Sequence, residues 1–308
     1  MTELATAWSR GLGLTAPIVN APMGGTAGGA LAAAVSAAGG LGMVGMGSSG
    51  SAAALSAELR HLQGLEQPFG IGLVQWVVAR DPDLLEVALS AHPALLAVSF
   101  GDDWSWIARA RDHGIRAAAQ VGDLSAAVAA VTAGADVVVV RGAEGGGHGA
   151  PTVGTLPLLA DVLDEVPVPV LAAGGISTGR AVAAVLAAGA AGAWVGTAFA
   201  ACTEALGSEE TRRVLLDADG TDTVTTRVVD IALGYPWPEH LPERVVRTDF
   251  VDRWTGREED LRRAGPGAGT ASAVNAGQGV GRLRTVRPAA AVVDELCTQA
   301  RDLLRRWG

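Results

Sequence analysis

Short apolar segments alternate with helix-like segments eight times along the first two thirds of the chain. The apolar segments are four to six residues long, and their centres recur about every 25 residues, the period of a strand followed by a helix. The expected strands are residues 16–20, 41–46, 69–74, 95–99, 115–120, 137–140, 167–171 and 192–195. Eight such units favour a closed (β/α)8 TIM barrel over an open sheet.

The chain divides into three parts. Its 308 residues suit one barrel of about 250 residues with extensions. Residues 1–204 form the expected barrel. Residues 205–286 break the strand-helix rhythm and contain most of the late charge, so we interpret them as a helical subdomain or lid over the barrel mouth. Residues 287–308 predict an amphipathic helix that packs on the barrel.

Composition excludes several functions. All 23 basic residues are arginine, so chemistry that needs a lysine amine, such as pyridoxal-phosphate catalysis, is excluded. The net charge of −9 and the scattered arginines argue against a nucleic-acid partner. Residues 11–57 and 181–203 are uncharged, but they are rich in alanine and glycine, so we predict no membrane span.

The beginning of the chain and its cysteines predict a cytoplasmic protein. No basic segment followed by an apolar core stands at the N-terminus. The two cysteines are far apart and have no metal-ligand spacing, so no metal site is expected.

The segment from Asp136 to Gly149 contains the strongest candidate for chemistry. Val137 to Val140 predict a strand that is buried on both faces. Three glycines, 145 to 147, follow and leave room for a ligand to approach the backbone. His148 stands at the end of this loop. Because barrel sites lie at the carboxyl ends of strands, His148 is a candidate catalytic residue.

Glycines after the last two strands predict a phosphate site. Gly174 and Gly175 precede a helix and can offer backbone N–H groups at its N-terminus, while Gly196 and Thr197 can offer a second set. Plain tight turns are the alternative. The glycines after the first strand do not indicate a dinucleotide fold, because no acidic residue follows the second strand.

Five sequence motifs together resemble the nitronate monooxygenase family, formerly called 2-nitropropane dioxygenases. They are Ala16-Pro-Ile-Val-Asn-Ala-Pro-Met, Gly142-Ala-Glu-Gly-Gly-Gly-His, Leu171-Ala-Ala-Gly-Gly-Ile, Val195-Gly-Thr-Ala-Phe and Asn275-Ala-Gly-Gln. The resemblance implies an FMN-binding TIM barrel in which Met23 lies beside the flavin and His148 is the active-site base. It also implies that Gly146 contacts the flavin and that Gly175, Gly196 and Thr197 hold its phosphate. The expected FMN-binding residues are Ala21, Pro22, Met23, Gly24, Gly72, Gln120, Arg141, Gly146, Gly147, Gly174, Gly175, Trp194, Val195, Gly196 and Thr197.

Three of these positions depart from the family pattern. Gly72 replaces an asparagine, Arg141 replaces a glutamine, and Trp194 replaces a polar residue. Recognition of the pyrimidine ring can then shift to Gln120 or Gln75. If Arg141 faces the N1–C2 edge of the ring, its positive charge would stabilise the reduced flavin and raise the reduction potential.

Several other polar residues have structural interpretations. Glu144 can shape the glycine loop or orient His148, and we favour the structural role. Cys202 is expected to be a small packed residue, and Asp103 a helix cap. Trp76, Trp104, Trp194 and Trp237 could each narrow the mouth of the site.

The resemblance predicts oxidation of an alkyl nitronate or nitroalkane by oxygen, giving a carbonyl compound and nitrite. A histidine suits this reaction, because a nitroalkane α-carbon must lose a proton to become a nitronate. Two alternatives stay open. One is a flavin-dependent enoyl-acyl-carrier-protein reductase that takes hydride from NAD(P)H, and the other is a flavin-binding barrel without turnover. The expected partner is a small-molecule substrate, and a homodimer is possible.

Overall fold

The barrel predicted from the sequence is present in the computed structural model, which describes residues 4–265 and 273–306. Its eight parallel strands are β1 (Ile18–Asn20), β2 (Gly42–Met46), β3 (Phe69–Val74), β4 (Leu95–Ser99), β5 (Arg116–Val121), β6 (Val137–Arg141), β8 (Val170–Ala173) and β9 (Gly192–Val195). They pair in the order β1-β9-β8-β6-β5-β4-β3-β2. The predicted (β/α)8 TIM barrel is therefore confirmed.

The barrel closes between β1 and β2, where the side chain of Asn20 contributes. Val19 and Leu41 form a parallel bridge. The Asn20 carboxamide donates from Nδ2 to the Met43 carbonyl over 2.9 Å, and its Oδ1 accepts from the Met43 amide over 2.8 Å. A buried side-chain amide thus replaces backbone bonds that the short strand β1 does not make.

Helices surround the strands. They are α2 (Gly29–Ala37), α3 (Ala52–Leu59), α4 (Gln75–Arg80), α5 (Asp83–Ser90), α6 (Ser105–Asp112), α7 (Leu124–Thr132), α8 (Thr155–Glu165) and α9 (Gly179–Ala187), with the 3₁₀ turn η1 (Arg60–Leu62) after α3. Ser51, Asp123 and Thr178 cap α3, α7 and α9 through their side-chain oxygens.

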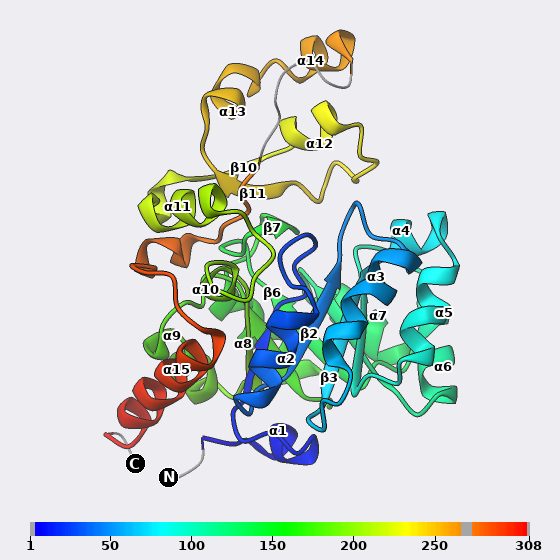
Figure 1. Cartoon of the computed structure of the whole chain (residues 1–308), viewed down its shortest axis with the longest axis vertical. Coiled ribbons are helices and arrows are strands. Elements are labelled where there is room, and N and C mark those ends of the chain that lie inside the picture. The colour runs from blue at the N-terminus through cyan, green and yellow to red at the C-terminus, as the bar shows by residue number, and fades with distance from the viewer. Residues whose placement is uncertain (1–3, 266–272, 307–308) are drawn as a thin grey trace.

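The core has two layers, which explains the valine run in β6. Val138 and Val140 belong to the layer between strands and helices, whereas Val137 and Val139 belong to the cluster inside the barrel. Helix α1 (Ala7–Gly11) closes the barrel end that lies away from residues 205–286 (Figure 1). Its Trp8 packs against the inner cluster.

The described residues of 205–286, here called the lid segment, lie over the carboxyl ends of the strands (Figure 1). The short helix α10 (Thr197–Ala200) precedes the segment. The lid segment contains α11 (Glu209–Asp217), η2 (Gly220–Asp222), β10 (Thr223–Thr226), α12 (Val228–Leu233), β11 (Glu243–Val246), α13 (Asp249–Trp254), α14 (Glu258–Ala264) and η3 (Gln278–Arg282). The lid segment thus contains four α-helices among its described residues, and its two strands were not predicted.

A small antiparallel sheet joins the lid segment to the barrel loop. Its order is β10-β11-β7, and β7 consists of Gly147 and His148 alone. A two-residue strand inside a glycine loop leaves no periodic pattern, so the sequence did not reveal it.

The last helix, α15 (Ala289–Leu304), packs against α9 and α2 and forms most of the helix expected at residues 287–308. None of the helices in the described part of the chain combines the length and the hydropathy needed to cross a bilayer.

Candidate active site

A cavity of about 460 Å³ lies between the carboxyl ends of the barrel strands and the lid segment. This volume is in the range of small-ligand sites. Of the residues predicted to bind a cofactor or act in catalysis, the cavity wall contains Ala21, Pro22, Met23, Gly24, Gly72, Gln120, Arg141, Gly146, Gly147, His148, Gly174, Gly175, Trp194, Gly196 and Thr197. Val195 does not line the cavity, because it is fully buried in the layer between strands and helices.

Gly72 lines the cavity, and Pro22 occupies the space that a side chain at residue 72 would need. A Cβ atom at residue 72 would lie 2.2 Å from Cγ of Pro22. The asparagine expected from the family pattern therefore has no room here unless Pro22 moves. Glycine at residue 72 is thus explained by its packing against Pro22.

Arg141 holds the glycine loop that contains His148. Its Nη2 atom donates to the carbonyl oxygens of Gly145, Gly146 and Gly147, over 2.6, 3.2 and 2.8 Å. Burial, together with the charge of Arg244, lowers the pKa of Arg141 to about 10. The guanidinium lines the cavity, but part of its donor capacity is used by the loop. Its first role is therefore to fix this loop.

Glu144 has the structural role that the sequence favoured. Its Oε2 atom accepts from the backbone N–H of Thr155 over 2.9 Å and from the Thr155 hydroxyl over 2.8 Å. A carboxylate at the start of α8 also suits the helix dipole. Glu144 ties the loop to α8 and does not orient His148.

The predicted phosphate turns line the cavity, and Gly174 and Gly175 lie before α9 with φ values of +120° and +67°. Helix α9 begins at Gly179, where the Thr178 side chain caps Ala181. Three residues, 176 to 178, separate Gly175 from the first residue of α9.

Thr197 links the second turn to the lid segment. Its hydroxyl oxygen accepts from the backbone N–H of Gly277 over 2.9 Å. Gly277 belongs to the Asn275-Ala-Gly-Gln motif, and Asn275 itself lines the cavity.

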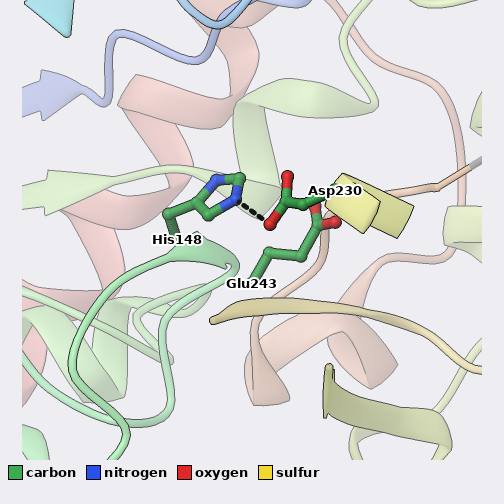
Figure 2. Close-up of side chains that lie close together, drawn as sticks. All are labelled: His148, Asp230 and Glu243. Carbon is green, nitrogen blue, oxygen red and sulfur yellow. Dashed lines mark hydrogen bonds and ion pairs between the residues drawn. The ribbon is translucent and has the colours of Figure 1, made fainter. Parts of the chain in front are cut away.

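His148 forms a hydrogen bond with Asp230 of the lid segment. Nε2 of His148 lies 2.9 Å from Oδ2 of Asp230, and the two side chains are only 11% and 8% exposed. Figure 2 shows the imidazole edge directed at the Asp230 carboxylate. Because a carboxylate only accepts, Nε2 carries the proton and Nδ1 keeps the lone pair in the neutral ring. Nδ1 is therefore the basic atom of His148.

Glu243 lies beside this pair. In the sheet β11 pairs with β7, and Glu243 stands directly opposite His148. One side-chain nitrogen or carboxylate oxygen atom from each of His148, Asp230 and Glu243 lies within 4.8 Å of those of the other two residues (Figure 2). Burial first, and the charge of Asp230 second, raise the pKa of Glu243 to about 8. The site thus contains two acidic side chains next to one imidazole.

Aromatic side chains cover the imidazole. The Trp237 ring stacks on His148 with a centroid distance of 3.5 Å and an interplanar angle of 6°. Phe100 meets Trp237 edge to face, and the Trp237 indole N–H donates to the Ser48 hydroxyl over 3.0 Å. Trp237 therefore restricts the ring of His148 and joins the lid segment to the loop after β2.

Of the remaining residues that the sequence suggested for the site, some line the cavity and others do not. Trp194 lines the cavity as predicted, whereas Trp76 and Trp104 do not line it. Gln75 does not line it either, because its amide donates to the carbonyl of Asp103. Of the two candidate glutamines, only Gln120 is available to a ligand.

The packed role of Cys202 is confirmed, whereas Asp103 is not the N-cap of α6, because Trp104 occupies that position. Cys202 is buried, and burial raises the pKa of its thiol to about 12. The Asp103 carboxylate accepts from the backbone N–H of Ser105 at the start of α6.

Asp230 and Glu243 were not expected from the sequence, and Trp237 was expected only as a residue that could narrow the mouth of the site. One signal was present for Asp230, because it is the only charged residue in the helix sequence Val-Val-Asp-Ile-Ala-Leu. A lone carboxylate among apolar residues needs a partner when it is buried. Glu243 has no comparable signal, because its position opposite His148 depends on an unpredicted sheet.

The fold and the cavity define an enzyme of the (β/α)8-barrel class. A family model described as nitronate monooxygenase matches residues 8–77 and 77–299. The chain belongs to the nitronate monooxygenase family and is an oxidoreductase rather than a barrel without turnover.

Curated relatives with different names match most of the chain. A nitronate monooxygenase of Metarhizium robertsii is 35% identical over 77% of this chain and 74% of its own length. The (3aS,4S,5R,7aS)-5-hydroxy-7a-methyl-1-oxo-octahydro-1H-indene-4-carboxyl-CoA dehydrogenase of Rhodococcus jostii is 32% identical over 82% of this chain and 68% of its own length.

Solved structures extend the similarity to nearly the whole chain. FabK from Thermotoga maritima has a TM-score of 0.86 and 28% identity, covering 99% of this chain and 98% of that chain. A nitroalkane oxidase from Streptomyces ansochromogenes has a TM-score of 0.80 and 30% identity, covering 95% of this chain and 98% of that chain.

Proposed function

We propose that this protein is an FMN-dependent oxidase of alkyl nitronates and nitroalkanes, which yields a carbonyl compound and nitrite. The observation that supports this proposal most directly is the His148–Asp230 pair in the cavity wall. It places a base with a carboxylate partner where a small carbon acid can enter. The family and the similar nitroalkane oxidase agree with this substrate class.

The lining of the cavity supports FMN as the cofactor. A Cβ atom at Gly196 would lie 3.6 Å from Met23 Sδ and 3.7 Å from the Ala21 Cβ, which are ordinary contact distances. Protein packing therefore does not require glycine at residue 196, whereas a ligand in the cavity that approaches the backbone does. Gly174, Gly175, Gly196 and Thr197 would hold the phosphate, and Gln120 can reach the ring system from the cavity wall. When bound, FMN supplies the electron acceptor for the oxidation.

His148 would perform the proton transfer. With Nε2–H donating to Asp230, the Nδ1 lone pair accepts the proton from the α-carbon of a nitroalkane. The resulting imidazolium is stabilised by the Asp230 carboxylate. For a nitronate, which has already lost this proton, the doubly protonated His148 donates a hydrogen bond from Nδ1–H to a nitronate oxygen while Nε2–H donates to Asp230. Trp237 fixes the ring plane and keeps water from one face of the base.

The test of this function is nitrite release in air from propionate 3-nitronate and from a neutral nitroalkane. The purified protein should be yellow, and heat should release FMN. Replacing His148 with alanine should lower turnover of the neutral nitroalkane by about 10²- to 10⁴-fold. The ionised nitronate should lose less, because it needs no deprotonation.

The second candidate is a flavin-dependent enoyl-thioester reductase that uses NAD(P)H. The observation in its favour is the structural similarity to FabK over nearly the whole chain. A yellow protein that releases no nitrite and is bleached by NADH or NADPH would support this candidate.

We also propose that the protein acts on a small molecule in the cytoplasm, without nucleic acid, membrane or bound metal, and that a homodimer is possible. Size-exclusion chromatography with light scattering measures the oligomeric state.

A further inference from the structure

Glu243 is a buried acid that the proposed reaction does not use. Its residue exposure is 3%, and its Oε1 atom has no hydrogen-bond partner among the described residues. A buried oxygen without a partner costs about 1–3 kcal/mol, so this position calls for an explanation.

The groups around Glu243 define its electrostatic setting. His148 faces it from β7 and Asp230 from α12, and the charge that acts on it is that of Asp230. Arg244, which follows Glu243 in β11, and Arg141, at the end of β6, donate to other groups. Arg244 donates to the Ala143 carbonyl and the Thr223 hydroxyl, and Arg141 donates to the glycine loop.

Two carboxylates and one imidazole cannot all carry their ordinary charges in this space. Neighbouring buried carboxylates repel, so one of the two keeps its proton. The imidazole lies 2.9 Å from Oδ2 of Asp230 and stabilises that carboxylate, whereas Oε1 of Glu243 has no partner among the described residues, so the proton is placed on Glu243. A protonated Glu243 also has a hydroxyl group, which can donate to a lone pair of the Asp230 carboxylate that His148 does not use.

We propose that Glu243 is a positioning residue, held as a neutral acid whose hydroxyl donates to Asp230 and thereby sets the proton affinity of His148. This inference rests on the proposed role of His148 as the base. The raised pKa of Glu243 agrees with it, and burial and the Asp230 charge are its causes.

The consequence for His148 follows from charge balance. A neutral Glu243 shares the negative charge of Asp230, so the imidazolium formed in the reaction is stabilised less and can release its proton more easily. Removing this donor leaves Asp230 free to stabilise the imidazolium fully, so His148 holds its proton more tightly. An ionised Glu243 would add a second negative charge and strengthen this effect.

The test is a histidine-labelled NMR titration of the full chain, with the His148 signal assigned by its loss in His148→Asn. Glu243→Gln keeps a neutral donor, so the midpoint of the His148 titration should stay nearly unchanged. Glu243→Leu removes the donor, so the midpoint should rise. A fall of about one pH unit or more in Glu243→Gln would overturn the proposal, because it would mean that the native Glu243 is ionised.

Infrared spectroscopy gives a second readout that depends on the unsubstituted protein. A protonated-carboxyl band should be present at pH 7 and absent from Glu243→Gln. The absence of this band from the unsubstituted protein would contradict the proposal, as would a stoichiometric divalent metal that is lost in Glu243→Gln. Neither readout needs turnover, so a failure of the proposed function in the nitrite assay remains distinguishable from a failure here.

Discussion

Nε2 of His148 and Oδ2 of Asp230 lie 2.9 Å apart, although 82 positions separate the two residues in the sequence. His148 belongs to the loop after β6, and Asp230 to α12 of the lid segment. His148 and its carboxylate partner therefore come together only when the lid segment is folded over the barrel. The lid segment is part of the candidate site.

Replacing Asp230 with asparagine should slow the deprotonation of neutral nitroalkanes about 10- to 100-fold. This range corresponds to the loss of a charge-assisted hydrogen bond of about 1.5–3 kcal/mol. Asp219→Asn is a matched control, because Asp219 lies in the same segment but caps η2. Equal losses in steady-state nitrite release from the two variants would argue against a specific role for Asp230.

Trp237→Ala should lower activity about 10-fold, because His148 loses the ring stacked on it. Trp237→Phe retains a ring and should lose less. Ser48→Ala removes only the hydrogen bond to the indole and separates that contact from the stack. Hydrogen exchange of the lid segment should rise most in Trp237→Ala. An unchanged exchange pattern in that variant would mean that Trp237 does not hold the segment.

Arg141→Met should lower turnover about 10- to 100-fold by releasing the loop that places His148. Arg111→Met is the control, since Arg111 donates to a single glycine carbonyl, that of Gly134, at an exposed position. Backbone exchange at residues 145–148 should increase only in Arg141→Met. If the loop stays protected in that variant, the anchoring role is wrong.

Gly72→Ala should destabilise the fold by about 1–3 kcal/mol, because its Cβ atom would lie 2.2 Å from Pro22. Pro22→Gly removes the atoms that it meets, so the double variant should lose less than the sum of the two single variants. A double-mutant cycle on urea unfolding measures the coupling, which we expect to be about 1 kcal/mol or more. Additive losses would contradict the packing pair.

Glu243 should make the protein less stable as pH rises from about 4.5 to about 8. The native acid keeps a proton to a pKa of about 8, whereas the unfolded chain releases it near the ordinary value of 4.5. The folded state therefore binds the extra proton in this interval, and stability falls with increasing pH. Thermal melts of Glu243→Gln should lack this component, so its melting temperature relative to the unsubstituted protein should rise across the interval. A pH-independent difference would show that Glu243 titrates normally.

The barrel could be predicted because its evidence is local. Each strand is a short apolar run, and each helix has its own stop or cap, such as Asp123 before α7. The glycine turns and His148 follow from the rule that barrel sites lie at the carboxyl ends of strands. Fourteen of the fifteen expected cofactor-binding residues line the cavity for this reason, and Val195 does not because its side chain faces the helices.

The partners of His148 could not be predicted in the same way. Their positions depend on the pairing of β7 with β11 and on the packing of α12 over the barrel, which are contacts between distant segments. Residue types in the lid segment give no register for a two-residue strand. Trp237 shows the same limit, since its stack on His148 and its bond to Ser48 both join parts far apart in the chain.

The most direct test of the proposed function is anaerobic rapid mixing of the yellow protein with propionate 3-nitronate and, separately, with NADH and NADPH. If the protein oxidises nitronates, the nitronate should rapidly bleach the flavin bands, and nitrite should form when air is admitted. NADH and NADPH should leave the spectrum unchanged over the same time. Rapid bleaching by a nicotinamide, with no reaction with the nitronate, would contradict the nitronate assignment and establish the reductase in its place.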